Sequence, residues 1–256
     1  RDTSVTGVQT CALPICSVEL RVYNSGTPLA IDKELGDDSI LFSIPMSYID
    51  RGVWSAVIDG DLEGKYYNYV ITNYKNKNIE VVDPYAKSCG ISGIRGMIVD
   101  FSKTNPKGWE DIKPHPYKRT EIVVYETHIS DITSSSSWTN DIEKLKYQKK
   151  FKGAYIEGTS FSLNGITVKT GFDHIKELGV NVVQLLPFFD SANDETKMVF
   201  NWGYNPLNYN TLEGSYSMNP YDGYERIREF KGLVKAYNEA GINIIMDVVY
   251  NHVSDA

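Results

Sequence analysis

The feature that most constrains the fold is a junction that occurs twice in the second half of the chain. Residues 178–183 (LGVNVV) and 240–245 (AGINII) share one pattern, in which the end of a predicted helix is followed by a glycine and a β-branched run. A glycine at this place can adopt the left-handed conformation that ends a helix. The continuous apolar run after it is typical of a strand buried on both faces. Two such junctions predict parallel β/α units.

Three buried strands are predicted, over residues 122–125, 180–189 and 242–250. Apolar residues at helical spacing predict helices over residues 172–178 and 222–240, directly before the second and third strands. Units of this kind build either a doubly wound sheet or a (β/α)₈ barrel. No glycine-rich phosphate loop follows any of the three strands in the sequence, which disfavours a nucleotide-binding sheet.

The loop after the second strand is unusually long. The two junctions lie about twice as far apart as one barrel unit of about 30 residues requires, and the surplus falls within residues 190–221. Loops at this position lie at the carboxyl end of the strands, where barrel active sites are found. The loop is rich in aromatic side chains, namely Phe200, Trp202, Tyr204, Tyr209, Tyr216 and Tyr221. A long loop in a compact domain is usually functional.

The first half of the chain has a different pattern. Residues 17–109 contain short alternating apolar segments separated by turn residues, which predict an antiparallel, immunoglobulin-like β-sandwich. Residues 110–121 lie in a proline-rich stretch without periodicity and are predicted to be a linker. We therefore expect an all-β sandwich over residues 17–109, followed by the first three β/α units of a TIM (β/α)₈ barrel over residues 122–256.

Composition excludes some partners. The formal net charge is −7 and the longest basic run is Lys149–Lys150, whereas phosphate backbones require a clustered basic face. No apolar stretch approaches the ~20 residues that span a bilayer. The three cysteines include no CxxC pair, which argues against a disulfide framework and a zinc site. We expect neither nucleic acid nor a membrane as partner.

Both ends of the chain look incomplete. Residues 1–16 show no helical or strand periodicity, and residues 5–15 (VTGVQTCALPI) resemble a translated sequencing adapter. The apolar part of this segment is too short for a secretory signal, so we set residues 1–16 aside as non-native. The compartment stays open between the cytoplasm and secretion from a bacterium. Four residues after His252 the chain stops at Ala256, with no helix after the last predicted strand.

Several motifs identify a family. Residues 200–206 (FNWGYNP) closely resemble the YNWGYDP signature of type I pullulanases, which are starch-debranching enzymes. Residues 247–252 (DVVYNH) resemble the first conserved region of the α-amylase superfamily. Residues 64–67 (GKYY) and 82–86 (VDPYA) resemble the starch-binding-type module that precedes such barrels. The resemblance covers nearly everything from Ser17 onward.

The resemblance implies a glycoside hydrolase that cleaves α-1,6 branch linkages in pullulan, starch or glycogen by a retaining double displacement. In this mechanism an Asp attacks the anomeric carbon and a Glu ~5 Å away protonates the leaving oxygen. In the superfamily these carboxylates lie on the fourth and fifth strands. We therefore expect them beyond Ala256, and expect the present fragment to be inactive alone.

The resemblance also assigns a substrate-binding set, namely Tyr204, Asp247, His252, Trp202 and Asn205. It implies that Tyr204 stacks on the sugar at subsite −1, that Asp247 helps to hold this sugar and the nucleophile region, and that His252 hydrogen-bonds the same sugar. Structural alternatives are core packing for the two aromatic residues, loop capping for Asp247 and a satisfied core position for His252. Asn205 replaces the Asp of the signature and therefore lacks its charge.

Asn251 matches a position that binds calcium in many amylases. Hard cations take several oxygen ligands and the sequence shows one candidate, so a loop-fixing role is favoured over a structural calcium ion. No other cofactor is expected. Glu126 and His128 alternate along the first barrel strand, but we interpret them as structural and not as an acid–base pair. Trp54 is interpreted as a core residue of the sandwich, with glucan binding as the alternative.

Two alternative functions stay open at this point. An isoamylase or branching-type enzyme of the same superfamily would share the layout, and a non-catalytic glucan-binding protein would share the binding residues.

Overall fold

The computed structural model describes residues 3–6, 15–75, 77–197 and 199–254. The chain divides into two compact units. The first comprises Arg1–Asp100, Asn208–Thr211 and Tyr221–Gly223, and the second comprises Phe101–Leu207, Leu212–Pro220 and Tyr224–Ala256. The main division thus falls at Asp100, whereas the sequence pattern placed the end of the first domain at Trp109.

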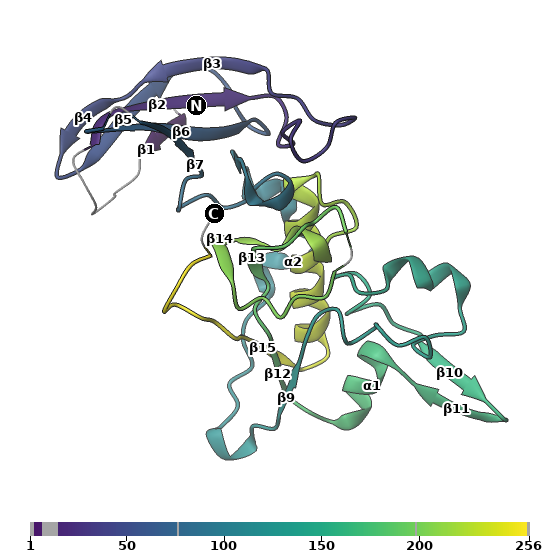
Figure 1. The fold of residues 1–256 in the computed structure, drawn as a ribbon. Coiled ribbons are helices and arrows are strands. Elements are labelled where there is room, and N and C mark those ends of the chain that lie inside the picture. The colour runs from purple at the N-terminus through teal and green to yellow at the C-terminus, as the bar shows by residue number, and fades with distance from the viewer. Residues whose placement is uncertain (1–2, 7–14, 76, 198, 255–256) are drawn as a thin grey trace. The chain divides into compact units, whose positions relative to one another are not determined.

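The first unit contains two antiparallel sheets (Figure 1). One has the order β3-β2-β6-β7 with β8 paired to β6, and the other has the order β1-β5-β4. Their strands are β1 (Thr3–Thr6), β2 (Ile15–Tyr23), β3 (Ile40–Pro45), β4 (Ser47–Asp50), β5 (Val53–Ile58), β6 (Tyr66–Asn73), β7 (Asn78–Val81) and β8 (Gly96–Met97).

The core of this unit is built from alternating apolar residues of both sheets. Val18, Leu20 and Val22 of β2 are buried with Tyr69 of β6, and Trp54 of β5 packs against them. The predicted β-sandwich is confirmed. Trp54 is part of this packing, as the core interpretation required.

Part of the segment that we set aside is paired in this unit. β1 runs antiparallel to β5, from Thr3 opposite Ile58 to Thr6 opposite Ser55. Ile15 and Cys16 begin β2. The expectation that residues 1–16 lack strand structure is therefore wrong for these two stretches. The backbone groups along the edge of β5 can pair with any extended chain, whatever its side-chain pattern. Residues 1–2 and 7–14 lie outside the described residues.

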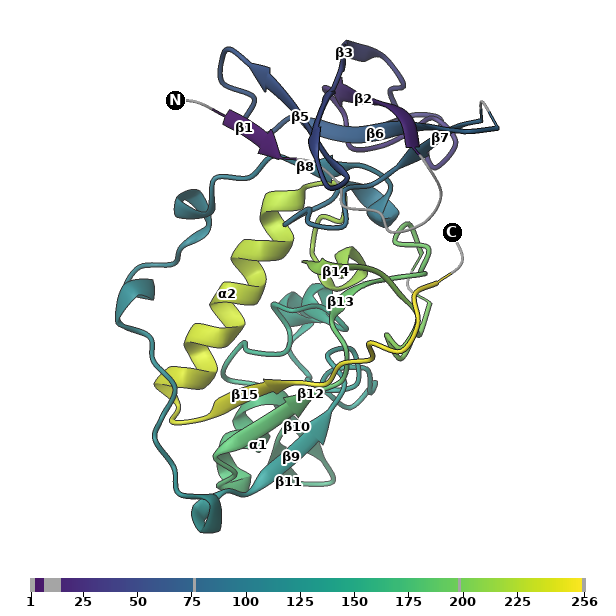
Figure 2. The same ribbon diagram turned by 90° about the vertical axis from the view of Figure 1, so that its left-hand side faces the viewer.

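The second unit is built on a parallel sheet with the order β15-β12-β9. Its strands are β9 (Val124–Thr127), β12 (Val182–Leu185) and β15 (Asn243–Met246), which lie side by side in Figure 2. Val182 lies opposite Val124 on one side and Asn243 on the other. The three predicted barrel strands are confirmed. β12 and β15 are shorter than predicted, and β9 has the predicted length but begins two residues later, at Val124. β12 stops two residues before Pro187, whose nitrogen cannot donate to a ladder.

Two helices precede β12 and β15 as the junctions predict. α1 (Gly171–Leu178) ends at Gly179 with φ 72°, and α2 (Gly223–Glu239) is followed by Gly241 with φ 76°. Both glycines have the left-handed conformation that was predicted for them. One face of the sheet, including Val183 and Leu185, is buried in a core shared with both helices.

The opposite face of the sheet carries both polar and apolar side chains and is partly open. Glu126 and Ile245 are exposed there, and Gln184 between them is half-buried. The remaining elements are the hairpin β10 (Ser160–Leu163) and β11 (Ile166–Lys169), the pair β13 (Phe189–Ser191) and β14 (Pro206–Leu212), and the 3₁₀ turns η1 (Ile91–Gly93), η2 (Phe101–Thr104), η3 (Trp109–Asp111), η4 (Arg119–Glu121), η5 (Ile142–Tyr147) and η6 (Gly214–Tyr216). None of the described helices is long and apolar enough to cross a membrane.

Candidate functional site

Two of the predicted site residues meet at the carboxyl end of the parallel sheet. Asp247 follows β15 directly, and its backbone N–H donates to the Leu185 carbonyl at 2.9 Å, which continues the ladder by one bond. Tyr204 comes from the long loop after β12, and its hydroxyl donates to Asp247 Oδ2 at 2.6 Å. Both residues are half-buried. The structure therefore brings together residues that are 43 positions apart in the chain.

Gly203 allows Tyr204 to reach this position. Its φ is 85°, a conformation that side chains other than glycine rarely adopt. A Cβ atom on Gly203 would lie 2.4 Å from the Pro187 carbonyl oxygen. Asn201 fixes the same turn, because its Oδ1 accepts from Gly203 N at 2.9 Å and its Nδ2 donates to the Ala192 carbonyl at 3.1 Å.

The hydrogen bond to Asp247 controls the charge of Tyr204. Together with burial and the negative charges of Asp247 and Glu126, it raises the pKa of Tyr204 to about 12. The hydroxyl therefore stays protonated at neutral pH and remains a donor. Glu126 in turn accepts from Gln184 Nε2 at 3.1 Å. We did not single out Gln184 from the sequence, although a polar residue inside the apolar run of β12 was a usable signal.

The other predicted residues lie on the same two segments. Ser254 N donates to the Pro206 carbonyl at 2.7 Å, which holds residues 251–254 beside the loop that carries Tyr204. His252 is exposed, and its Nδ1 lies 3.1 Å from Asn251 Nδ2. The core alternative is therefore wrong for His252. The sugar contact of His252 and the loop-fixing role of Asn251 stay predictions.

Trp202 and Asn205 are both exposed. The Trp202 side chain is 61 % exposed, so the alternative of core packing is wrong for this residue. The Asn205 carbonyl accepts from Ala192 N at 2.9 Å, which anchors the backbone and leaves the amide side chain at the surface. Substrate contact of these two side chains stays a prediction.

His128 is buried and both of its ring nitrogens have partners. Nδ1 accepts from Ser130 N at 3.2 Å, so Nε2 carries the proton and donates to the Asn201 carbonyl at 2.9 Å. Tyr216 Oη lies 2.8 Å from the same Nε2. Burial lowers the pKa of His128, which keeps the ring neutral. These contacts agree with the structural interpretation of His128, whose ring connects the segment after β9 to the long loop.

Three buried carboxylates lie close together inside the long loop. Among the described residues, this cluster is the candidate for a metal site. The ligand oxygens of Asp190, Glu195 and Glu213 lie within 4.8 Å of one another. Glu195 is paired with buried Arg226 at 3.1 Å and accepts from Gly214 N at 2.6 Å.

Hydrogen bonds occupy a second carboxylate of this cluster. Both oxygens of Glu213 accept bonds, from Ser191 and from Ser215 N. Because calcium takes about six to eight oxygen ligands, a cluster already bound to a guanidinium and to N–H donors fits it poorly. Asn251 is not a member of this cluster.

Comparisons with known proteins cover both units. Residues 100–256 match the family model of the α-amylase catalytic domain, and residues 36–86 match carbohydrate-binding module 48, the isoamylase N-terminal domain. The pullulanase of Bacillus subtilis (strain 168) is 36 % identical over 214 residues, which cover 81 % of this chain and 28 % of the relative. The chloroplastic isoamylase SU1 of Zea mays is 29 % identical over 277 residues, which cover 93 % of this chain and 32 % of the relative.

A solved structure agrees with these matches. The crystal structure of a pullulanase from Paenibacillus barengoltzii, in complex with maltohexaose and α-cyclodextrin, superposes with a TM-score of 0.87 at 34 % identity. The match covers 99 % of this chain and 37 % of that one. The chain thus spans about a third of the length of these proteins. The resemblance that was drawn from residues 200–206 and 247–252 is confirmed.

Proposed function

Because this chain belongs to the α-amylase catalytic-domain family, we propose that it forms part of a glycoside hydrolase that cleaves α-1,6-glucosidic branch linkages in pullulan, starch or glycogen. The observation that carries the proposal is the Tyr204–Asp247 hydrogen bond at the carboxyl end of three parallel strands. The pullulanase relatives and the solved pullulanase with bound maltohexaose support both the reaction class and an α-glucan as partner.

The site residues of this chain bind and orient the sugar in the proposed reaction. The Tyr204 ring offers a flat apolar face for a glucose ring, and its protonated hydroxyl holds Asp247 in one orientation. Asp247 Oδ1 then faces the sugar hydroxyls as an acceptor. The nucleophilic Asp and the acidic Glu of the retaining mechanism are expected about 5 Å apart on barrel strands other than β9, β12 and β15. The reaction needs no cofactor, and a calcium ion near Asn251 stays a prediction.

An isoamylase-type debranching enzyme is the second candidate. The similarity to the maize isoamylase supports it. Asn205 departs from the pullulanase signature, because it lacks the charge of the Asp in that motif. The two candidates differ in substrate: a pullulanase releases sugar from pullulan, while an isoamylase acts on the branch points of glycogen.

The test measures reducing-sugar release by the protein that carries this chain. We expect release from pullulan and none from linear amylose, and we expect Tyr204→Ala to lower kcat/KM for pullulan at least tenfold. Tyr74→Ala, which removes a half-exposed tyrosine of the first unit, is the matched control and should leave kcat/KM unchanged. Release from glycogen but not pullulan would favour the isoamylase-type candidate. Activity on amylose alone would contradict debranching.

A further inference from the structure

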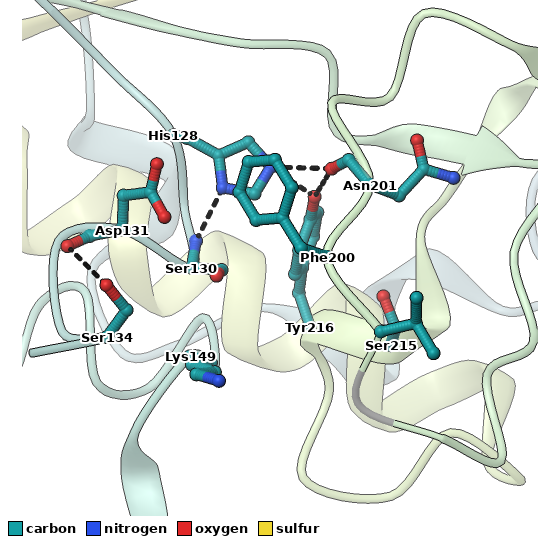
Figure 3. A pocket seen from close by; sticks show the side chains of 10 residues that line it. His128, Ser130, Asp131, Ser134, Lys149, Phe200, Asn201, Ser215 and Tyr216 are labelled. Carbon is teal, nitrogen blue, oxygen red and sulfur yellow. Dashed lines mark hydrogen bonds between the residues drawn. The ribbon is translucent and has the colours of Figure 1, made fainter.

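A pocket lies in the unit that carries the parallel sheet, between the segment after β9 and the long loop after β12 (Figure 3). Its volume is about 220 Å³. Neither Tyr204 nor Asp247 lines it. The pocket is thus separate from the candidate site described above, although Phe200 and Asn201 in its wall belong to the same short segment as Tyr204.

One wall of the pocket is a partly open aromatic ring. The Phe200 side chain is 53 % exposed, and its ring lies against the His128 ring with centroids 5.0 Å apart. His128 is itself held by hydrogen bonds to Asn201 and Tyr216. Tyr216 is buried and packs edge-on against Phe151 at 5.5 Å. Phe200 therefore rests on a fixed, buried layer.

The lining of the pocket also carries one charge of each sign. Asp131 and Lys149 line the pocket, and among the described residues neither side chain has an ion-pair partner. Lys149 has an uncommon backbone conformation for a residue with a side chain, with φ 63°, and its N–H donates to Thr133 Oγ1 at 2.6 Å. The lining thus offers a carboxylate acceptor and an ammonium donor beside an aromatic ring.

The aromatic ring and the two charged side chains together indicate the class of ligand. A sugar hydroxyl can donate to the Asp131 carboxylate, and a sugar oxygen can accept from the Lys149 ammonium group. A neutral ring with several hydroxyl groups can therefore use both charged groups. The volume lies below the roughly 300 Å³ at which pockets for drug-sized ligands begin. A single sugar unit is therefore the size that fits.

We propose that this pocket binds one glucosyl unit of an α-glucan, with the sugar stacked on Phe200, its hydroxyls donating to Asp131, and Lys149 donating to a sugar oxygen. The choice of an α-glucan rests on the proposed function. The pocket shares the 200–206 segment with Tyr204, so a sugar bound there also restrains the loop that presents Tyr204. Loss of the pocket should therefore raise KM for pullulan more than it lowers kcat.

The test counts maltotriose sites on the protein that carries this chain by isothermal titration calorimetry. We expect each of Phe200→Ala, Asp131→Asn and Tyr204→Ala to have one site fewer than the wild type. The double variant of Phe200→Ala with Tyr204→Ala should have two sites fewer. Cellotriose, the β-linked analogue, should bind the pocket at least tenfold more weakly. Leu163→Ala and Glu143→Gln remove an exposed apolar and an exposed acidic side chain outside the pocket, and both should keep the wild-type number of sites.

Three other results would each overturn a different part of the proposal. If Tyr204→Ala loses a maltotriose site while Phe200→Ala and Asp131→Asn match the wild type, the pocket is not a sugar site and the proposed function stands. If cellotriose binds equally well, the assignment to an α-glucan is wrong. If the wild type neither binds maltotriose nor releases sugar from pullulan or glycogen, the proposed function fails and this inference fails with it. Thermal melts of Phe200→Ala and Asp131→Asn check that both variants are folded.

Discussion

The buried ion pair between Arg226 and Glu195 should dominate the stability of the long loop. Both side chains are fully buried, with Nη2 of Arg226 3.1 Å from Glu195 Oε2. Arg226 extends from α2 and also donates to the Leu212 carbonyl at 2.9 Å and to the Pro220 carbonyl at 2.7 Å. One guanidinium thus connects the helix to three separate parts of the loop.

Replacing Arg226 with Met should therefore be costly. The substitution leaves Glu195 as a buried negative charge beside two further carboxylates, Asp190 and Glu213. Breaking a buried pair by removing one partner costs about 3–5 kcal/mol. The two carbonyls that lose their donor add to this cost, although such contributions are not additive. We expect a loss of about 4 kcal/mol, which is roughly 8–16 °C in Tm for a unit of this size.

The assay is differential scanning calorimetry of the protein that carries this chain, with Arg228→Met as the matched control. Arg228 lies on the same helix and pairs with Glu225 at 3.5 Å, but both side chains are more than a third exposed. An exposed pair is worth less than about 1 kcal/mol, so the control should shift Tm by no more than a few degrees. Adding Glu195→Gln to Arg226→Met should recover part of the loss. Equal shifts for Arg226→Met and Arg228→Met would refute the reasoning.

Two further predictions concern pH and backbone strain. Burial raises the pKa of Glu229 from 4.5 to about 7, so the folded state keeps a proton that the unfolded state releases. This contribution to stability is present below about pH 4.5 and is lost as the pH rises through about 7, by up to about 3 kcal/mol. The Tm of the wild type should therefore fall relative to that of Glu229→Gln between pH 5 and pH 8, and a constant difference would contradict the assignment. Gly203→Ala should cost about 1–3 kcal/mol because of its positive φ and the close Pro187 carbonyl. Gly179→Ala has a similar φ but open space around the added Cβ, so it should cost less, and an equal loss of Tm would count against the steric argument.

Much of this fold follows from local sequence patterns. The glycines at 179 and 241 mark helix ends because φ is a local property, and the apolar runs of β12 and β15 need burial on both faces wherever they lie. Tyr204 and Asp247 could be paired because both follow neighbouring parallel strands, whose carboxyl ends meet at one edge of a sheet. The motif resemblance then supplied the expected roles of both residues.

The pocket lined by Phe200 and Asp131 could not be predicted in this way. Asp131 and Phe200 have no common motif, and a shared wall between them depends on how His128 connects two loops. The pairing of β1 with β5 was missed for a related reason. Edge pairing uses backbone groups, which leave no trace in the pattern of side chains.

The long loop obtains its shape largely from buried polar side chains. Lys150 Nζ donates to the Ser215 carbonyl at 2.8 Å, and Glu229 accepts from Met218 N at 3.1 Å. Together with Glu195 and Glu213, the side chains of Lys150 and Glu229 form hydrogen bonds with backbone N–H and C=O groups of the loop. In a β-sheet, such backbone groups would be paired with a neighbouring strand. A satisfied buried network accepts few alternative geometries, because each broken bond leaves a polar group unpaired at low dielectric.

Such a network also restricts the sequence of the loop. A Cβ on Gly214 would lie 2.3 Å from Arg226 Nη2. Position 214 must therefore be a glycine for the guanidinium to lie beside Glu195. An apolar core of the same volume would tolerate more than one packing of its side chains. The parts of the long loop on either side of the segment with Phe200 and Tyr204 are therefore held by buried charges, and we expect substitutions among these charges to weaken the proposed glucan binding as well as stability.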